Sequence, residues 1–326
     1  MIKMTGSITS AFSEPEDFEA ALRLEGCVGM LITGRGEFRA QLTQVALHRL
    51  RLSATAEQLS RIAFIAMPAD MVVVSFPISN ETVPVPVRGG IRIQPGNIMT
   101  LGPGEHVHVR TYGPRRWGAV WIPVQELVRY GSALTGAPFA VSPVARRWQP
   151  PPAAGRRLRS LHAAAIRMAA IRPQVFLHAE TAHGLEQQLI HAVVECLSIG
   201  SSVESRPAAR RNQAIMVRFE QVLESQPDRK LCMTEICAVL GVSDRRLRSL
   251  CAEYLGLSPV GYDRLRRMSL VRRALRSGDS NAASVSAVAR RYAFSNIDRF
   301  NASYRTAFGE LPSVALCGFG ILRLHK

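Results

Sequence analysis

Short runs of β-branched and aromatic residues dominate the chain between residues 26 and 125. Gly, Pro and Asn residues separate these runs, as turns separate consecutive strands. The clearest runs are Val28–Thr33, Phe38–Leu52, Arg61–Met67, Met71–Phe76 and Gly118–Ile122. Many short strands joined by short turns predict a compact antiparallel barrel or sandwich.

The pattern changes to helical spacing near Pro123. Residues 123–134 suit a helix, and two longer amphipathic helices are predicted over 156–171 and 175–198. The second of these has an apolar stripe made of Leu185, Leu189, Val193 and Cys196. We expect this helical region to form a homodimer interface. The Pro-rich segment 147–155 is predicted to be a linker, and 200–211 a flexible hinge.

Residues 234–255 have the pattern of a helix, a tight turn and a second helix. Ile236 and Leu240 share one face of the first helix, and Gly241 can adopt the left-handed backbone that the turn needs. Ser243 can cap the second helix, expected at about 244–255. Its inward face is apolar, whereas the outward face carries Arg245, Arg248, Ser249 and Ala252. A helix with one cationic face suits the major groove of DNA.

The same arrangement recurs about fifty residues later, with Ala293 at the turn and Asn296 as the expected cap of a helix at about 296–307. The outward residues of this second helix are Asp298, Asn301, Ala302 and Arg305. A long helix over 259–277, begun by Pro259, would join the two units. Ala293 predicts local strain, because a Cβ atom in a left-handed turn costs about 1 kcal/mol. The alternative is a turn relaxed to a right-handed form, which would slightly re-aim its recognition helix.

Charge follows the same division of the chain. The net charge is +16, and residues 206–326 hold 21 Lys and Arg against 10 Asp and Glu. A basic segment of this kind indicates a polyanionic partner. Arginine is also frequent in the first 205 residues, so a general bias toward arginine is an alternative explanation of the charge alone.

Together these motifs resemble the AraC/XylS family of transcription regulators. The residues that carry the resemblance are Ile236, Leu240-Gly241-Val242-Ser243, Leu255-Gly256-Leu257-Ser258-Pro259, Val288-Ala289, Tyr292-Ala293-Phe294, Phe300, Tyr304, Phe308-Gly309 and Pro312. The resemblance covers about 213–313, with Cys237 and Ala293 standing where the family favours Ala and Gly. It implies an α+β multidomain chain: a cupin-like β-barrel sensor domain (1–145), a helical dimerisation region with a hinge (146–212), and an all-α DNA-binding domain with two helix-turn-helix units (213–326).

The resemblance implies that both recognition helices enter successive major-groove segments of double-stranded promoter DNA. The predicted DNA-binding residues are Ser243, Arg245, Arg246, Arg248, Ser249, Asp298, Arg299, Asn301 and Arg305. Arg245 and Arg248 are the best candidates for base contacts. The arginines of 264–276, Arg272 among them, are expected to contact phosphates or solvent.

The predicted function is therefore an effector-responsive, sequence-specific transcription regulator. No enzyme activity, catalytic residue, cofactor or metal is expected. The expected partners are a small-molecule effector of unknown identity and, for an activator, RNA polymerase. No segment suits a membrane span, and a cytoplasmic location is expected. Trp117 and Trp121 could line a pocket or belong to the core. The alternative function is a cupin-like metalloenzyme with a basic tail, based on His106 and His108.

Overall fold

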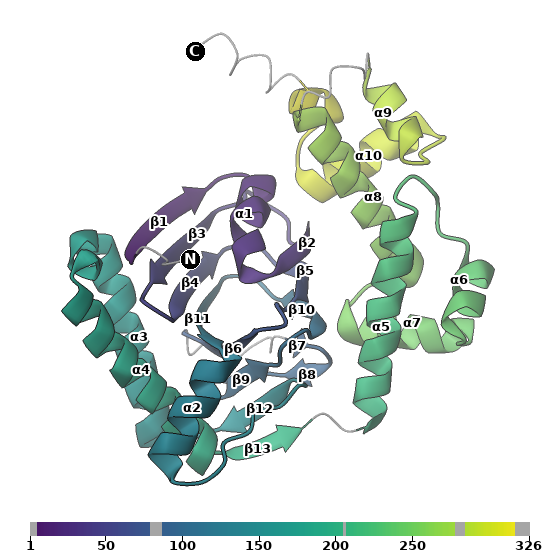
Figure 1. Cartoon of the computed structure of the whole chain (residues 1–326). Helices are drawn as coiled ribbons and strands as arrows, with labels where there is room; N and C mark the ends of the chain where they lie inside the picture. Colours follow the sequence, from purple (N-terminus) through teal and green to yellow (C-terminus); the bar gives the residue numbers. More distant parts are fainter. Residues whose placement is uncertain (1–4, 79–86, 205–206, 278–283, 317–326) are drawn as a thin grey trace.

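The computed structural model describes residues 5–78, 87–204, 207–277 and 284–316. Its N-terminal part is built on two antiparallel sheets (Figure 1). The large sheet has the strand order β1-β3-β4-β11-β6-β9-β12-β13, and the small sheet β2-β5-β10-β7-β8. The strands of the large sheet are β1 (Gly6–Phe12), β3 (Ala40–Ala46), β4 (Arg51–Glu57), β6 (Met71–Pro77), β9 (Ile98–Leu101), β11 (Arg115–Pro123), β12 (Arg146–Gln149) and β13 (Ser201–Glu204). Those of the small sheet are β2 (Cys27–Ile32), β5 (Arg61–Ala66), β7 (Val87–Arg88), β8 (Ile91–Arg92) and β10 (His106–Thr111).

The two sheets share an apolar interior to which strands of both contribute. Val73 and Leu101 of the large sheet pack in one cluster with Val107 and Val109 of the small sheet. Within the described residues neither sheet's order of hydrogen-bonded strands closes on itself. The expected closed, cupin-like barrel is therefore replaced by two open sheets facing each other, the second of the two architectures that the strand pattern allowed.

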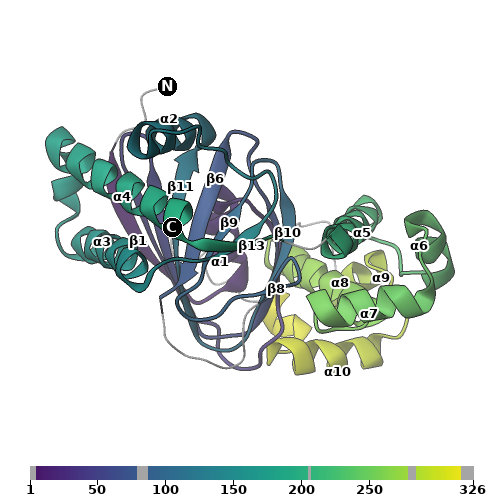
Figure 2. The same ribbon diagram turned by 90° about the horizontal axis from the view of Figure 1, so that it is seen from below.

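Helices α2 (Val124–Thr135), α3 (Pro152–Ile171) and α4 (Ala179–Ile199) lie on the outer side of the large sheet (Figures 1 and 2). Leu189 and Val193 of α4 are fully buried in one core with Val74 of β6. The apolar stripe that the sequence suggested as a dimer interface thus packs inside the chain, because the outer side of the sheet is itself apolar and needs cover.

The segments predicted to be linker and hinge contain strands. Arg146–Gln149 (β12) pairs with β9 on one side and with Ser201–Glu204 (β13) on the other. Pro150 and the two prolines after it correctly indicated a break. They end a strand and begin helix α3, where a missing backbone N–H is tolerated. The linker prediction was therefore wrong for its first residues.

The C-terminal part is helical, as expected. Its helices are α5 (Pro207–Ser225), α6 (Met233–Leu240), α7 (Asp244–Tyr254), α8 (Pro259–Arg276), α9 (Val285–Arg291) and α10 (Ile297–Phe308). The short helix α1 (Pro15–Leu22) and the 3-10 turns η1 (Arg23–Glu25) and η2 (Pro173–Leu177) complete the described elements. Helix α8 contributes side chains to both helical cores, Tyr262 to the one around α7 and Val271 to the one around α10. Among the described helices, none is both long enough and apolar enough to cross a membrane.

Candidate nucleic-acid interface

The first helix-turn-helix unit is formed by α6 and α7. Gly241 ends α6 with a left-handed backbone (φ 66°, ψ 34°), and an added Cβ would meet nothing within 4 Å there. Ser243 caps α7, its Oγ accepting a hydrogen bond of 3.2 Å from the backbone N–H of Arg246. Leu247 and Leu250 are fully buried beneath α7. The turn and the cap therefore fix how α7 is presented to solvent.

All the α7 residues predicted to contact DNA are exposed: Ser243, Arg245, Arg246, Arg248 and Ser249. Arg248 forms a two-point ion pair with Asp244 one turn earlier, Nε to Oδ1 at 2.5 Å and Nη2 to Oδ2 at 3.2 Å. These contacts raise the pKa of Arg248. The Nη2 of Arg246 donates to Oδ1 of Asn212 on α5 at 2.5 Å. To contact a base, Arg248 must therefore break its ion pair with Asp244 or give up one of its two hydrogen bonds to that carboxylate.

The second unit, α9 and α10, repeats this geometry with a non-glycine turn. Ala293 has φ 60°, and it is the one residue other than glycine with a positive φ in the described part of the chain. Arg267 of α8 stabilises the turn, because its Nη1 donates to the carbonyls of Tyr292 (3.0 Å) and Ala293 (3.3 Å). The Nε of Arg267 donates to Asp263 at 3.0 Å. Arg267 was expected to face phosphates or solvent, and it instead holds the second turn together.

Helix α10 begins at a cap that matches the first unit, with Oδ1 of Asn296 accepting from the backbone N–H of Arg299 at 2.8 Å. Asp298, Arg299 and Arg305 are exposed on its surface. Asn301 is half-buried, and its Oδ1 is a buried atom without a hydrogen-bond partner. The outward face of α10 therefore combines charges of both signs with one amide, and it is less basic than the outward face of α7.

Arg272 was expected to contact phosphates, and the structure shows otherwise. It is 7% exposed and binds carboxylates of both parts of the chain. Its partners are Glu16 at 2.6 Å, Glu310 at 2.8 Å and Glu14 at 3.0 Å. The neighbouring arginines of α8 contact the same acidic segment, Arg273 through Glu19 (2.8 Å) and Arg276 through Glu14 (2.9 Å). Sequence reasoning missed the contacts with Glu14, Glu16 and Glu19 because these residues lie more than 250 positions from the arginines that bind them.

A second contact joins the small sheet to the helical part. The Nε2 of His108 on β10 lies 3.1 Å from Oε2 of Glu220 on α5, and Tyr262 donates to the same oxygen at 2.6 Å. Burial acts to raise the pKa of Glu220, but the contacts with His108 and Tyr262 outweigh it and hold the pKa below its ordinary value. The Nδ1 of His106 lies 3.1 Å from the carbonyl of Gly104. Nowhere in the described ranges do three metal-ligating side chains gather.

Comparison with known proteins agrees with this geometry. A family described as a helix-turn-helix domain matches residues 236–316. The XylDLEGF operon transcriptional activator 2 of Pseudomonas putida is 31% identical over 126 residues, which are 39% of this chain and 76% of that protein. The XylDLEGF operon transcriptional activator of the same organism is 31% identical over 118 residues, 36% of either chain. The match thus spans about a third of that activator's length.

A probable thc operon regulatory protein of Rhodococcus erythropolis is 30% identical over 91 residues, 28% of this chain and 27% of that one. Among solved structures, the AraC-like transcriptional activator CuxR aligns over 87% of this chain and 99% of its own, with 15% identity and a TM-score of 0.45. The chain belongs to the AraC/XylS family of transcription regulators.

Proposed function

We propose that this protein is a sequence-specific, effector-responsive transcription regulator that inserts α7 and α10 into successive major-groove segments of promoter DNA. The observation that carries the proposal is the duplicated unit. Each copy has a left-handed turn, a capped helix with a buried apolar side and an exposed polar side, and α8 packs against both. Such a pair can follow one face of a duplex as the groove turns past it.

In this proposal the exposed side chains divide by role. Arg245 and Arg248 of α7 would read base edges, because a guanidinium can donate two hydrogen bonds to guanine. Ser243, Arg246 and Ser249 would contact the sugar–phosphate backbone near the start of α7. On α10, Asp298 and Asn301 would face bases while Arg299 and Arg305 contact phosphates.

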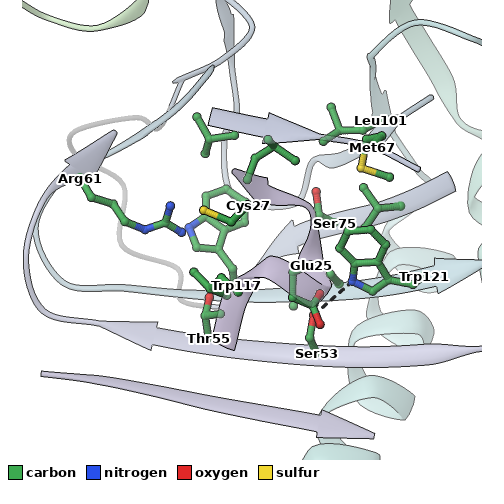
Figure 3. A pocket seen from close by; sticks show the side chains of 16 residues that line it. Glu25, Cys27, Ser53, Thr55, Arg61, Met67, Ser75, Leu101, Trp117 and Trp121 are labelled. Atoms are coloured by element: carbon green, nitrogen blue, oxygen red, sulfur yellow. Dashed lines mark hydrogen bonds between the residues drawn. The ribbon is translucent and has the colours of Figure 1, made fainter. Parts of the chain in front are cut away.

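A cavity between the two sheets is the proposed effector site (Figure 3). It measures about 80 Å³, and its apolar wall includes Trp117, Trp121 and Leu101. Arg61 adds a polar group: its Nε and Nη2 donate to Glu57, while its Nη1 is buried without a partner. A largely apolar site with a few polar groups suits a small organic effector that offers an acceptor to this nitrogen.

The same strands that line this cavity also contact the helical part, which supports effector control of DNA binding. Ile65 of β5 and Val109 of β10 line the cavity. The adjacent Phe64 and His108 lie against the helices, His108 through its contact with Glu220. Neighbouring side chains of a strand point to opposite faces, so a shift of either strand on effector binding would move both surfaces.

A second copy of the chain and RNA polymerase are the further partners in this proposal. A homodimer would place two copies on adjacent sites, and RNA polymerase would be the partner of an activator. The apolar stripe of α4 is occupied within the chain, so it is not the surface proposed for the dimer.

The test is the binding of the full-length protein to DNA from the chain's own genome as salt is raised. Contacts with several phosphates predict a steep linear fall of the logarithm of the binding constant with the logarithm of salt concentration. Selection from fragmented genomic DNA should also recover a shared sequence. A folded protein that retains no DNA at low salt would refute the proposal.

A further inference from the structure

The outer side of the N-terminal part contains a cleft that the proposed DNA-binding and effector sites do not use. It lies between α3 and the end of β6 and measures about 350 Å³. Its lining residues are Phe76, Ile78, Arg156, Arg159, Ser160, His162, Ala163 and Arg167. No described residue that lines it is acidic, so three cationic side chains share the cleft without a carboxylate.

These three arginines have no partner among the described residues. One face of α3 carries all three. Arg159 follows Arg156 by three positions, and Arg167 follows Arg159 by eight, spacings that keep them on the same side of a helix. None makes a hydrogen bond or ion pair within the described chain, although Arg157 on the adjacent face reaches Glu195 at 3.5 Å. The arginines of this face of α3 are therefore unpaired among the described residues, whereas the arginine on the adjacent face is paired.

Arg159 is the most informative of the three. Its side chain is half-buried, and its Nη1 is a buried atom without a hydrogen-bond partner. Burial lowers the pKa of Arg159, and the nearby charge of Arg156 lowers it further. The more deeply buried Arg61, Arg267 and Arg272 all bind carboxylates. Because a desolvated guanidinium is normally paired, Arg159 lacks the anion that its surroundings call for.

We propose that this cleft binds a small phosphorylated molecule, a phosphomonoester or a diphosphate. Guanidinium groups match phosphate oxygens with parallel hydrogen bonds, and several arginines suit a ligand of more than one negative charge. Ile78 and Ala163 offer apolar surface beside them for the rest of the ligand. The site is separate from the cavity between the sheets and does not depend on the proposed function.

DNA is not the occupant that the geometry favours. Helix α3 lies on the far side of the sheets from α7 and α10 in both views (Figures 1 and 2). A duplex held by the two recognition helices would run along the opposite end of the molecule. The ligand is therefore a diffusible phosphate compound, and DNA affinity serves as an independent readout.

The experiment is calorimetric titration of the full-length protein with inorganic pyrophosphate at constant ionic strength. We expect saturable binding with a dissociation constant of about 1 mM or lower. The double variant Arg156→Gln/Arg167→Gln should weaken it at least about tenfold, since each lost arginine removes charge-assisted hydrogen bonds. Both residues are exposed, so the fold should persist, and Arg159→Gln should have a similar effect.

The control is Arg172→Gln, which removes the same charge from an exposed residue just past the end of α3. It should leave pyrophosphate binding unchanged, and all these variants should bind DNA like the unaltered protein. Absence of saturable binding, or equal weakening by the control, would overturn the proposal. Pyrophosphate binding that survives the double variant would place the anion elsewhere and overturn it equally.

Discussion

Replacing Ala293 with glycine tests the strained turn of the second helix-turn-helix unit. The φ of 60° puts the backbone of Ala293 in the left-handed region, where the Cβ of an L-residue crowds a carbonyl oxygen at a cost of about 1–2 kcal/mol. Glycine removes that strain but adds about 0.4–1 kcal/mol of entropy to the unfolded chain. The net expectation for Ala293→Gly is a stabilisation of about 0.5–1 kcal/mol, or roughly 1–4 °C in the melting midpoint.

The first unit provides the reciprocal control. Gly241→Ala places a Cβ in open space at φ 66°, so it reports the backbone energy without a steric clash. It should destabilise by an amount similar to what Ala293→Gly gains. Calorimetric melts of the full-length variants measure both changes as shifts of a melting midpoint relative to the unaltered protein. A lowered midpoint for Ala293→Gly would refute the account of strain, because a relaxed turn would register only the entropy of glycine.

The remaining predictions concern charge. Arg248→Ala should weaken binding to the preferred sequence by about 1–3 kcal/mol and relax the preference at one base pair, whereas equal losses on every sequence would assign it to the backbone. Arg272→Met should destabilise the protein by about 1–3 kcal/mol, because it removes the cation shared by three partly buried carboxylates, yet keep the salt dependence of DNA binding; a shallower salt slope would instead assign Arg272 to a phosphate contact. His162 is buried, and burial lowers its pKa to about 4. Below pH 6.5 this imidazole therefore becomes protonated in the unfolded chain but stays neutral in the native chain until about pH 4. Stability should therefore fall by about 3 kcal/mol between pH 6.5 and 4, and His162→Gln should remove that part of the fall in urea titrations at both pH values.

The helix-turn-helix part could be predicted from sequence because its determinants are local. Gly241, Ser243 and Asn296 act within a few residues of where they stand, and the structure confirms the caps and turns that they predicted. The positive φ of Ala293 also follows from local packing, since Phe294 and Phe300 keep their places in the core of the second unit. Helical spacing and capping involve residues only a few positions apart in the sequence, and both helix-turn-helix units depend mainly on such local contacts.

The roles of individual arginines could not be predicted in the same way. Arg267 and Arg272 have the same spacing and charge as solvated residues on a helix, and their partners belong to other elements. The destination of the α4 stripe was ambiguous for a related reason, because an apolar face does not state whether a sheet or a second copy covers it. The small β12 and β13 strands were missed since each forms only by pairing with a segment that is distant in the sequence.

The most direct test of the central claim is a hydroxyl-radical footprint of the full-length protein on a promoter fragment that it selects. Two recognition helices in successive major-groove segments predict two protected patches on one face of the duplex, about one helical turn or 10 base pairs apart. Arg245→Ala together with Arg248→Ala should erase one patch, and Arg305→Ala should weaken the other. A single protected patch that both sets of variants erase together would contradict the claim that α7 and α10 each occupy a groove.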